Sequence, residues 1–146
     1  MSLTNIFDIA GSGMAAQSLR LNTTASNIAN ADSASSSEGD VYRARKPVFA
    51  AIQQDAMSQA LSGQMGELPA SQGVQVQGIV ESDAPLDMRF QPDHPMANEQ
   101  GYVMYPNVNV VEEMADMLSA SRSFQTNVSI MDSAKTMMQR LLTLGQ

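Results

Sequence analysis

The sequence predicts an α+β protein with a long helix at each end and a small β-rich middle module. Two observations favour this fold class. Apolar residues recur at every seventh position in both terminal segments, and short alternating apolar runs occur only in the middle. The terminal helices are expected to pair as a coiled coil. In this interpretation residues 1–31 and 107–146 form a terminal-helix assembly domain, and residues 32–106 form the β module.

The first 30 residues are expected to form one helix. Its apolar row is made of Phe7, Met14, Leu21 and Ile28. Leu3 and Ala10 begin an interleaved row, and Ser2 or Asn5 is the expected N-cap. The opposite face carries mainly Ser, Thr, Asn and Gln with few charged residues, which is typical of a face that contacts protein rather than water. Gly11 and Gly13 weaken an isolated helix but allow a neighbouring backbone to approach closely.

The middle of the chain combines loops with short strands. Residues 32–40 have the composition of a loop, and strands are expected within residues 41–52, 74–80 and 85–90. A turn bracketed by Pro92 and Pro95 follows. Residues 53–73 contain few aromatic residues and much Gln, Ser, Ala and Gly, so they are interpreted as a flexible insertion or a weak helix.

The C-terminal segment is predicted to be a long packing helix from Val110 to Leu144. Its every-seventh row is Val110, Met117, Phe124, Met131 and Met138. Four residues after each of these lie Met114, Ser121, Val128, Lys135 and Leu142, most of them apolar. Asn109 is the expected N-cap, and Gly145 marks the expected end. The Met-rich stripe is interpreted as coiled-coil filling, with an adaptable binding surface as the alternative.

Composition excludes several classes of protein. The chain carries 8 basic and 15 acidic residues, and its one basic cluster (Arg43, Arg45 and Lys46) is too small to favour nucleic-acid binding. The absence of cysteine excludes disulfides and thiolate metal sites. Leu, Ile, Val and Phe supply only about one residue in five, so a thin core completed by partners is expected. Neither a membrane-spanning segment nor a cleavable signal peptide is expected.

Candidate catalytic residues are few. His94 is the only histidine and adjoins Asp93, but a metal site needs more ligands, so a turn residue is the expected role. Glu112 and Glu113 are interpreted as helix-start charges rather than as a carboxylate pair. The sequence contains no phosphate-binding loop and no nucleophile motif. We therefore predict a protein that is not an enzyme and has no cofactor or metal.

Two stretches carry a resemblance to a known family. The run TASNIANA at residues 24–31 contains Ser26, Asn27, Ile28, Ala29 and Asn30, and it resembles the signature of flagellar rod, hook and hook-associated proteins. The run GYVMYPNVNVVEEM at residues 101–114, with SASRSFQTN at 119–127 and the last three residues, is similar to short basal-body rod proteins. The opening residues 5–22 resemble them as well.

The resemblance implies a structural role without catalysis. Members of the family polymerise helically into the proximal rod, part of the drive shaft that crosses the periplasm and transmits torque. They leave the cell through the flagellar type III export apparatus, without a cleaved signal peptide. The implied partners are other rod proteins and further copies of the chain, without nucleic acid or membrane insertion.

The terminal helices are the expected assembly interface, and two alternatives remain open. The first is a monomeric helical hairpin that covers its own sheet. The second is a helical adaptor, similar to a secretion chaperone, that uses the Met-rich seam for client helices. The expected interface residues are Leu3, Phe7, Met14, Leu21, Ile28, Val110, Met114, Met117, Phe124, Val128, Met131, Met138 and Leu142.

Overall fold

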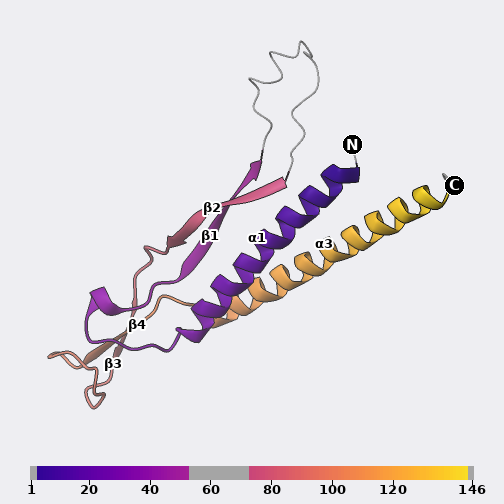
Figure 1. Cartoon of the computed structure of the whole chain (residues 1–146). Coiled ribbons are helices and arrows are strands. Elements are labelled where there is room, and N and C mark those ends of the chain that lie inside the picture. The colour runs from indigo at the N-terminus through magenta and orange to yellow at the C-terminus, as the bar shows by residue number, and fades with distance from the viewer. Residues whose placement is uncertain (1–2, 53–72, 145–146) are drawn as a thin grey trace, which may run out of the picture. The chain divides into compact units, whose positions relative to one another are not determined.

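The computed structural model describes residues 3–52 and 73–144 (Figure 1). Its two long helices are α1 (Leu3–Ala29) and α3 (Val110–Leu144). Between them lie the short 3₁₀ helix η1 (Glu38–Asp40) and the strands β1 (Arg45–Ile52), β2 (Gly73–Glu81), β3 (Asp87–Phe90) and β4 (Tyr102–Tyr105). The predicted α+β fold with long terminal helices is confirmed.

The start of α3 agrees with the predicted cap. The side-chain oxygen of Asn109 accepts hydrogen bonds from the backbone N–H groups of Val111, at 3.1 Å, and Glu112, at 3.4 Å. Acidic residues in this first turn complement the positive end of the helix dipole. At the other helix, Asn5 lies inside α1 and is therefore not its cap. The alternative cap Ser2 and the expected stop Gly145 lie outside the described residues.

The strands form two small two-stranded sheets. One sheet pairs β1 with β2, and the other pairs β3 with β4 in antiparallel register from Asp87 opposite Tyr105 to Phe90 opposite Tyr102. Strands β1 and β3 fall in the segments predicted for them. Strand β2 extends the predicted segment 74–80 by one residue at each end, so Gly73, which was predicted to belong to the insertion, is the first residue of the strand. Strand β4, which lies between Gly101 and Pro106, was not predicted. Residues 53–72 of the expected insertion lie outside the described residues.

The chain divides into two compact units, and each contains part of both helices. Unit 1 comprises Met1–Ser18, Val48–Gly78 and Ser121–Gln146, and unit 2 comprises Leu19–Pro47 and Ile79–Ala120. The division into an assembly domain and a β module stays a prediction.

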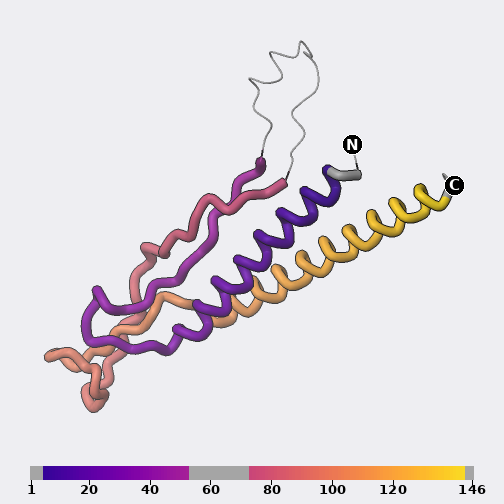
Figure 2. Tube along the Cα trace, in the orientation of Figure 1, coloured from indigo at the N-terminus to yellow at the C-terminus, as the bar shows by residue number. Residues whose placement is uncertain are grey.

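Within both units the chain runs in opposite directions along α1 and α3 (Figure 2). In unit 2, Arg20 pairs with Asp116, and Asn27 pairs with Glu113. In unit 1, Gly13 faces Asn127. The expected pairing of the two helices is therefore present and antiparallel.

The buried apolar residues are few and mostly small. Among the described residues they are Ala10, Ala16, Val41, Ala44, Val103, Ala120 and Ala134. Alanine lets helix backbones approach closely but removes little apolar surface from water. Many larger apolar side chains are instead exposed, and more than half of these lie on α3. The expectation of a thin core is confirmed.

Candidate assembly interface

The fully buried residues of α3 are not those of the second predicted row, which lies four positions after the every-seventh row. The every-seventh row is half-buried at Met117, Phe124 and Met131, and exposed at its two ends, Val110 and Met138. The fully buried residues lie three positions further along, at Glu113, Ala120 and Ala134, with half-buried Asn127 between them. Spacings of seven and three place these two rows on one helix face, as in a heptad.

The predicted companion row, four positions along, is not the seam within the chain. Met114 is 59% exposed and Leu142 is 69% exposed, and Val128 is exposed as well. The sequence predicted this row because three of its five members are apolar and its spacing fits a heptad. The buried row instead combines two alanines with the polar Glu113 and Asn127, which contact Asn27 and Gly13 of α1. The larger side chains are thereby left on the surface of the single chain.

The predicted row of α1 lies at the margin of the buried face. Phe7, Met14, Leu21 and Ile28 are all half-buried. The fully buried positions are the smaller Ala10, Ala16, Thr23, Thr24 and Asn27. Thr23 satisfies its buried hydroxyl by donating to the carbonyl of Leu19 at 2.9 Å. The side chain of Leu3 lies outside the description.

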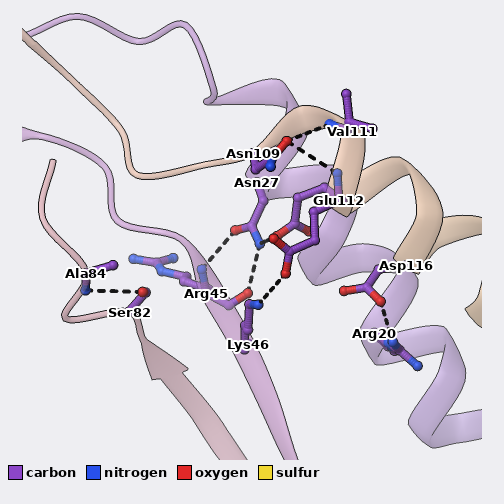
Figure 3. A network of polar contacts seen from close by, with 11 residues as sticks. Arg20, Asn27, Arg45, Lys46, Ser82, Ala84, Asn109, Val111, Glu112 and Asp116 are labelled. Atoms are coloured by element: carbon purple, nitrogen blue, oxygen red, sulfur yellow. Dashed lines mark hydrogen bonds and ion pairs between the residues drawn. The ribbon is translucent and has the colours of Figure 1, made fainter. Parts of the chain in front are cut away.

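Asn27 is the most connected residue of the signature run at residues 24–31. It is only 1% exposed, and each end of its carboxamide makes two hydrogen bonds. The oxygen accepts from the backbone N–H of Arg45 at 2.9 Å, which Figure 3 shows, and from the hydroxyl of Tyr42 at 2.8 Å. The nitrogen donates to the carbonyl of Arg45 at 2.8 Å and to the carboxylate of Glu113 at 3.0 Å. One side chain thus joins α1, β1 and α3.

The other residues of that run act at the end of α1. The side-chain nitrogen of Asn30 donates to the carbonyl of Ser26 at 2.8 Å, and the backbone N–H of Asn30 donates to the same carbonyl at 3.1 Å. Ile28 is half-buried, and Ser26 and Ala29 are exposed. Asn27 therefore fixes the packing, whereas Asn30 closes the last helical turn.

Ion pairs lie around the buried junction formed by Asn27, Tyr42, Arg45 and Glu113. Arg20 contacts Asp116 at 2.6 Å, and Lys46 contacts Glu112 at 3.1 Å (Figure 3). The hydrogen bond from Lys46 to Glu112 raises the pKa of the ammonium group, outweighing desolvation. Because Glu112 is bonded to Lys46 and Glu113 to Asn27, these neighbours do not act as a carboxylate pair.

The pKa of the Tyr42 hydroxyl is also changed by its surroundings in the junction. Desolvation by burial raises the pKa of its hydroxyl, and the nearby carboxylates of Glu113 and Glu81 raise it further, against the opposing effect of Arg45. The neutral hydroxyl is the form that donates to Asn27. Burial thus favours the protonation state that the network requires.

Sequence reasoning missed Asn107 as an anchor. Its nitrogen donates to the carbonyls of Ser82, at 3.2 Å, and Ala84, at 2.9 Å, while its oxygen accepts from the backbone N–H of Ala44 at 2.8 Å. Asn107 lies two residues before the cap Asn109, inside the rod-like run at residues 101–114. The available signal was this asparagine-rich stretch immediately before a helix.

His94, the remaining residue considered for catalysis or metal binding, lies in a turn. His94 accepts a hydrogen bond from the backbone N–H of Met96 at 3.1 Å through Nδ1, which agrees with a turn role. Within residues 3–52 and 73–144, no group of three or more potential metal ligands comes together. In the same part of the chain, neither helix is sufficiently long and apolar to cross a membrane.

Two family models match the terminal segments. The model described as flagella basal body rod protein matches residues 7–34. The model described as flagellar basal body rod FlgEFG protein C-terminal matches residues 99–144. These matches include most of α1, all of α3, and the two junction residues Asn27 and Glu113.

Relatives named flagellar basal-body rod protein FlgC match the whole chain. The relatives from Salmonella typhimurium and Escherichia coli O6:H1 are each 48% identical over 146 residues, covering both chains completely. The relative from Borreliella burgdorferi is 33% identical over 151 residues, covering 100% of this chain and 99% of its own. These names describe a rod component rather than an enzyme. The chain belongs to the FlgC family of flagellar basal-body rod proteins.

Proposed function

We propose that this chain, a structural subunit of the flagellar basal-body rod, polymerises through its two terminal helices. The observation that carries the proposal is the row of large apolar side chains exposed on α3. Large exposed apolar surfaces often mark binding sites for partners, and α3 exposes ten large apolar side chains among its described residues. The buried face of α3 already contacts α1, so the exposed side chains remain available for neighbouring subunits.

The interface we propose contains the rows expected from the sequence. Burying a large apolar side chain contributes about 1.5–3 kcal/mol, so several such residues supply substantial assembly energy. Its members are Leu3, Phe7, Met14, Leu21, Ile28, Val110, Met114, Met117, Phe124, Val128, Met131, Met138 and Leu142. Torque then passes through many buried helix contacts, with no single site carrying the load.

The position in the rod, the partners and the export route are proposed from the family to which the chain belongs. We place the subunit in the proximal part of the rod, which crosses the periplasm, with other rod proteins and copies of itself as partners. Export through the flagellar type III apparatus, without a cleaved signal peptide, completes the proposal. Residues 1–31 with 107–146 form the proposed assembly domain, and residues 32–106 form the β module.

The test replaces exposed apolar residues that do not support the folded chain. We expect Met114→Gln with Leu142→Gln to leave the far-ultraviolet spectrum and melting temperature nearly unchanged, because both side chains are exposed. The same double variant is expected to lower swimming in soft agar and the amount of the chain in purified basal bodies. Measuring the variant in culture supernatant separates a failure of assembly from a failure of export.

A matched control lies outside the helices. Val80 is an exposed apolar residue on β2, so Val80→Gln introduces the same polarity without touching the proposed interface. We expect wild-type swimming from this variant. Normal motility and normal incorporation of the Met114 and Leu142 variant would contradict assembly through α3. A stable soluble dimer that never enters basal bodies would favour the adaptor alternative.

A further inference from the structure

The hairpin formed by β3 and β4 has an apolar face that is exposed at three of its four side chains and half-buried at Met104. In the register, Met88 lies opposite Met104 and Phe90 lies opposite Tyr102. Directly opposed residues of an antiparallel pair project to the same face, so these four side chains share one surface. We call it the hairpin face. Met88 is 63% exposed and Phe90 is 64% exposed, whereas Val103, which alternation places on the opposite face, is completely buried.

The hairpin face is held in shape by local contacts. The rings of Phe90 and Tyr102 meet edge to face with centroids 5.3 Å apart. Phe90 also covers Gly101, where φ is +83° and an added Cβ would lie 2.9 Å from the ring. On the other side, Arg89 is fixed by an ion pair to Asp87 and lies over the ring of Tyr105. A preformed apolar face costs little ordering entropy when it binds.

Unpaired acids accompany the hairpin face. The loop that joins β3 to β4 carries Asp93 and Glu99, both exposed and without an ion pair among the described residues. The only basic side chain of the hairpin, Arg89, is already engaged by Asp87. A partner that covers this surface is therefore favoured if it combines apolar side chains with positive charge.

The C-terminal part of α3 has that combination. Its residues 121–144 contain Arg122, Lys135 and Arg140 against the single acid Asp132, although the whole chain has a net charge of −7. None of these three basic residues forms an ion pair within the described residues, whereas every other described basic side chain does. The same segment exposes Val128, Ile130, Met137, Met138, Leu141 and Leu142.

We propose that the hairpin face of one copy binds the C-terminal part of α3 of a second copy. The inference rests on the proposed function, because it names one contact within the polymer. Apolar burial supplies the attraction, and the opposite charges select the partner and its orientation. The two surfaces are different, so the contact is head-to-tail and leaves a free hairpin face on one copy and a free α3 surface on the other. Such a contact builds an open polymer.

The absence of cysteine permits a direct test. Met88→Cys and Leu141→Cys place one thiol on each surface at exposed positions, in a chain that otherwise contains none. Basal bodies isolated from cells carrying the double variant are oxidised and examined by non-reducing electrophoresis. We expect a ladder of dimers and higher multimers. Each single variant is expected to remain monomeric, because a head-to-tail contact never brings two equivalent residues together.

A matched control uses the other end of the same helix. Val111 is an exposed apolar residue on α3 outside the proposed surface, so Met88→Cys with Val111→Cys should give no ladder. Charge reversal supplies a second readout: Asp93→Lys with Glu99→Lys should reduce the ladder, and adding Lys135→Glu with Arg140→Glu should restore it. Asp32→Lys with Asp40→Lys is the control for charge change alone.

The outcomes separate this contact from the proposed function. Incorporation of the double-cysteine variant without a ladder overturns the contact while leaving rod assembly intact. An internally cross-linked monomer, or dimers from either single variant, also overturns it. If the unmodified chain is absent from basal bodies, the proposed function itself fails. If the first variant is not incorporated, a second pair, Tyr102→Cys with Met137→Cys, tests the same contact at two other exposed positions.

Discussion

Asn27 and Glu113 form a buried hydrogen bond of 3.0 Å between residues 86 positions apart in the chain. Asn27 is 1% exposed and Glu113 is 5% exposed, so water does not replace this contact when it is lost. The same carboxamide pairs with both backbone groups of Arg45. A single neutral side chain thereby fixes the relative register of α1, β1 and the start of α3.

Removing this carboxamide is expected to destabilise the fold. Asn27→Ala takes away four hydrogen bonds and leaves the carboxylate of Glu113 buried without its donor, which costs about 2–4 kcal/mol. Urea denaturation followed by circular dichroism measures the change. Asn22→Ala is the matched control, because Asn22 is exposed on the same helix, and it should change stability by less than about 0.5 kcal/mol. Equal losses from the two variants would contradict the role of Asn27.

The two glycines of α1 are expected to respond differently to alanine. Nothing lies within 4 Å of a Cβ added at Gly11, so Gly11→Ala should stabilise the chain by up to about 1 kcal/mol through helix propensity. A Cβ at Gly13 would lie 2.9 Å from the side-chain nitrogen of Asn127, so Gly13→Ala should gain less. Combining Gly13→Ala with Asn127→Ala should recover the difference in thermal denaturation. An equal gain from both single variants would show that the contact with Asn127 carries no strain.

Stability is expected to fall in alkaline solution through Tyr42 and Lys46. Both groups have a folded-state pKa above the ordinary values of 10.0 and 10.5, so the unfolded chain releases these protons first. Their contribution is fully present below about pH 10 and is lost as the pH rises through the folded-state values. Urea denaturation at pH 9, 10 and 11 measures this slope. Tyr42→Phe and Lys46→Met should each flatten it, and an unchanged slope in both variants would assign the alkaline loss to other groups.

The sequence was sufficient to predict the long helices because their signals are local and repeated. Seven-residue periodicity and the Asn109 cap predicted α3 with its observed bounds. Strand β4 was missed because its four residues show no usable period and its pairing with β3 is a tertiary contact. Similarly, Asn107 is recognisable as an anchor only when the carbonyls of Ser82 and Ala84 are nearby.

The identity of the buried row on α3 also depends on the partner surface. Periodicity alone shows which residues share a face, but the width of the gap to α1 decides which residues fit there. The small Ala120 and Ala134 are buried, whereas the larger Met114 is exposed. An interpretation based on hydrophobicity alone places Met114 in the buried row ahead of the two alanines. The junction at Asn27 was similarly hidden, because its three partner residues, Tyr42, Arg45 and Glu113, lie 15 to 86 positions further along the chain.

Phe124 is expected to contribute both to the fold and to assembly. The ring is half-buried in the single chain, so Phe124→Ala should lower the free energy of unfolding by about 1–3 kcal/mol, less than at a fully buried site. Swimming and the amount of the chain in basal bodies should fall further than this stability loss explains. Phe49→Ala, at an exposed ring on β1, is the control. Intact motility with Phe124→Ala would count against the every-seventh row as part of the interface.

The end of α3 is expected to be the first part of the free chain to be cleaved. Every described side chain beyond Ala134 is exposed, from Lys135 to Thr143, so little packing opposes local unfolding of these last turns. Trypsin should therefore cut first after Arg140 and Lys135, and later after Arg20, whose side chain is held by Asp116. Mass spectrometry of a time course identifies the order, and Lys135→Gln with Arg140→Gln should remove the early products. A C-terminus as resistant as Arg20 would mean that the helix is already covered in solution. That result would favour the adaptor alternative, which requires ordered ends before any polymer forms.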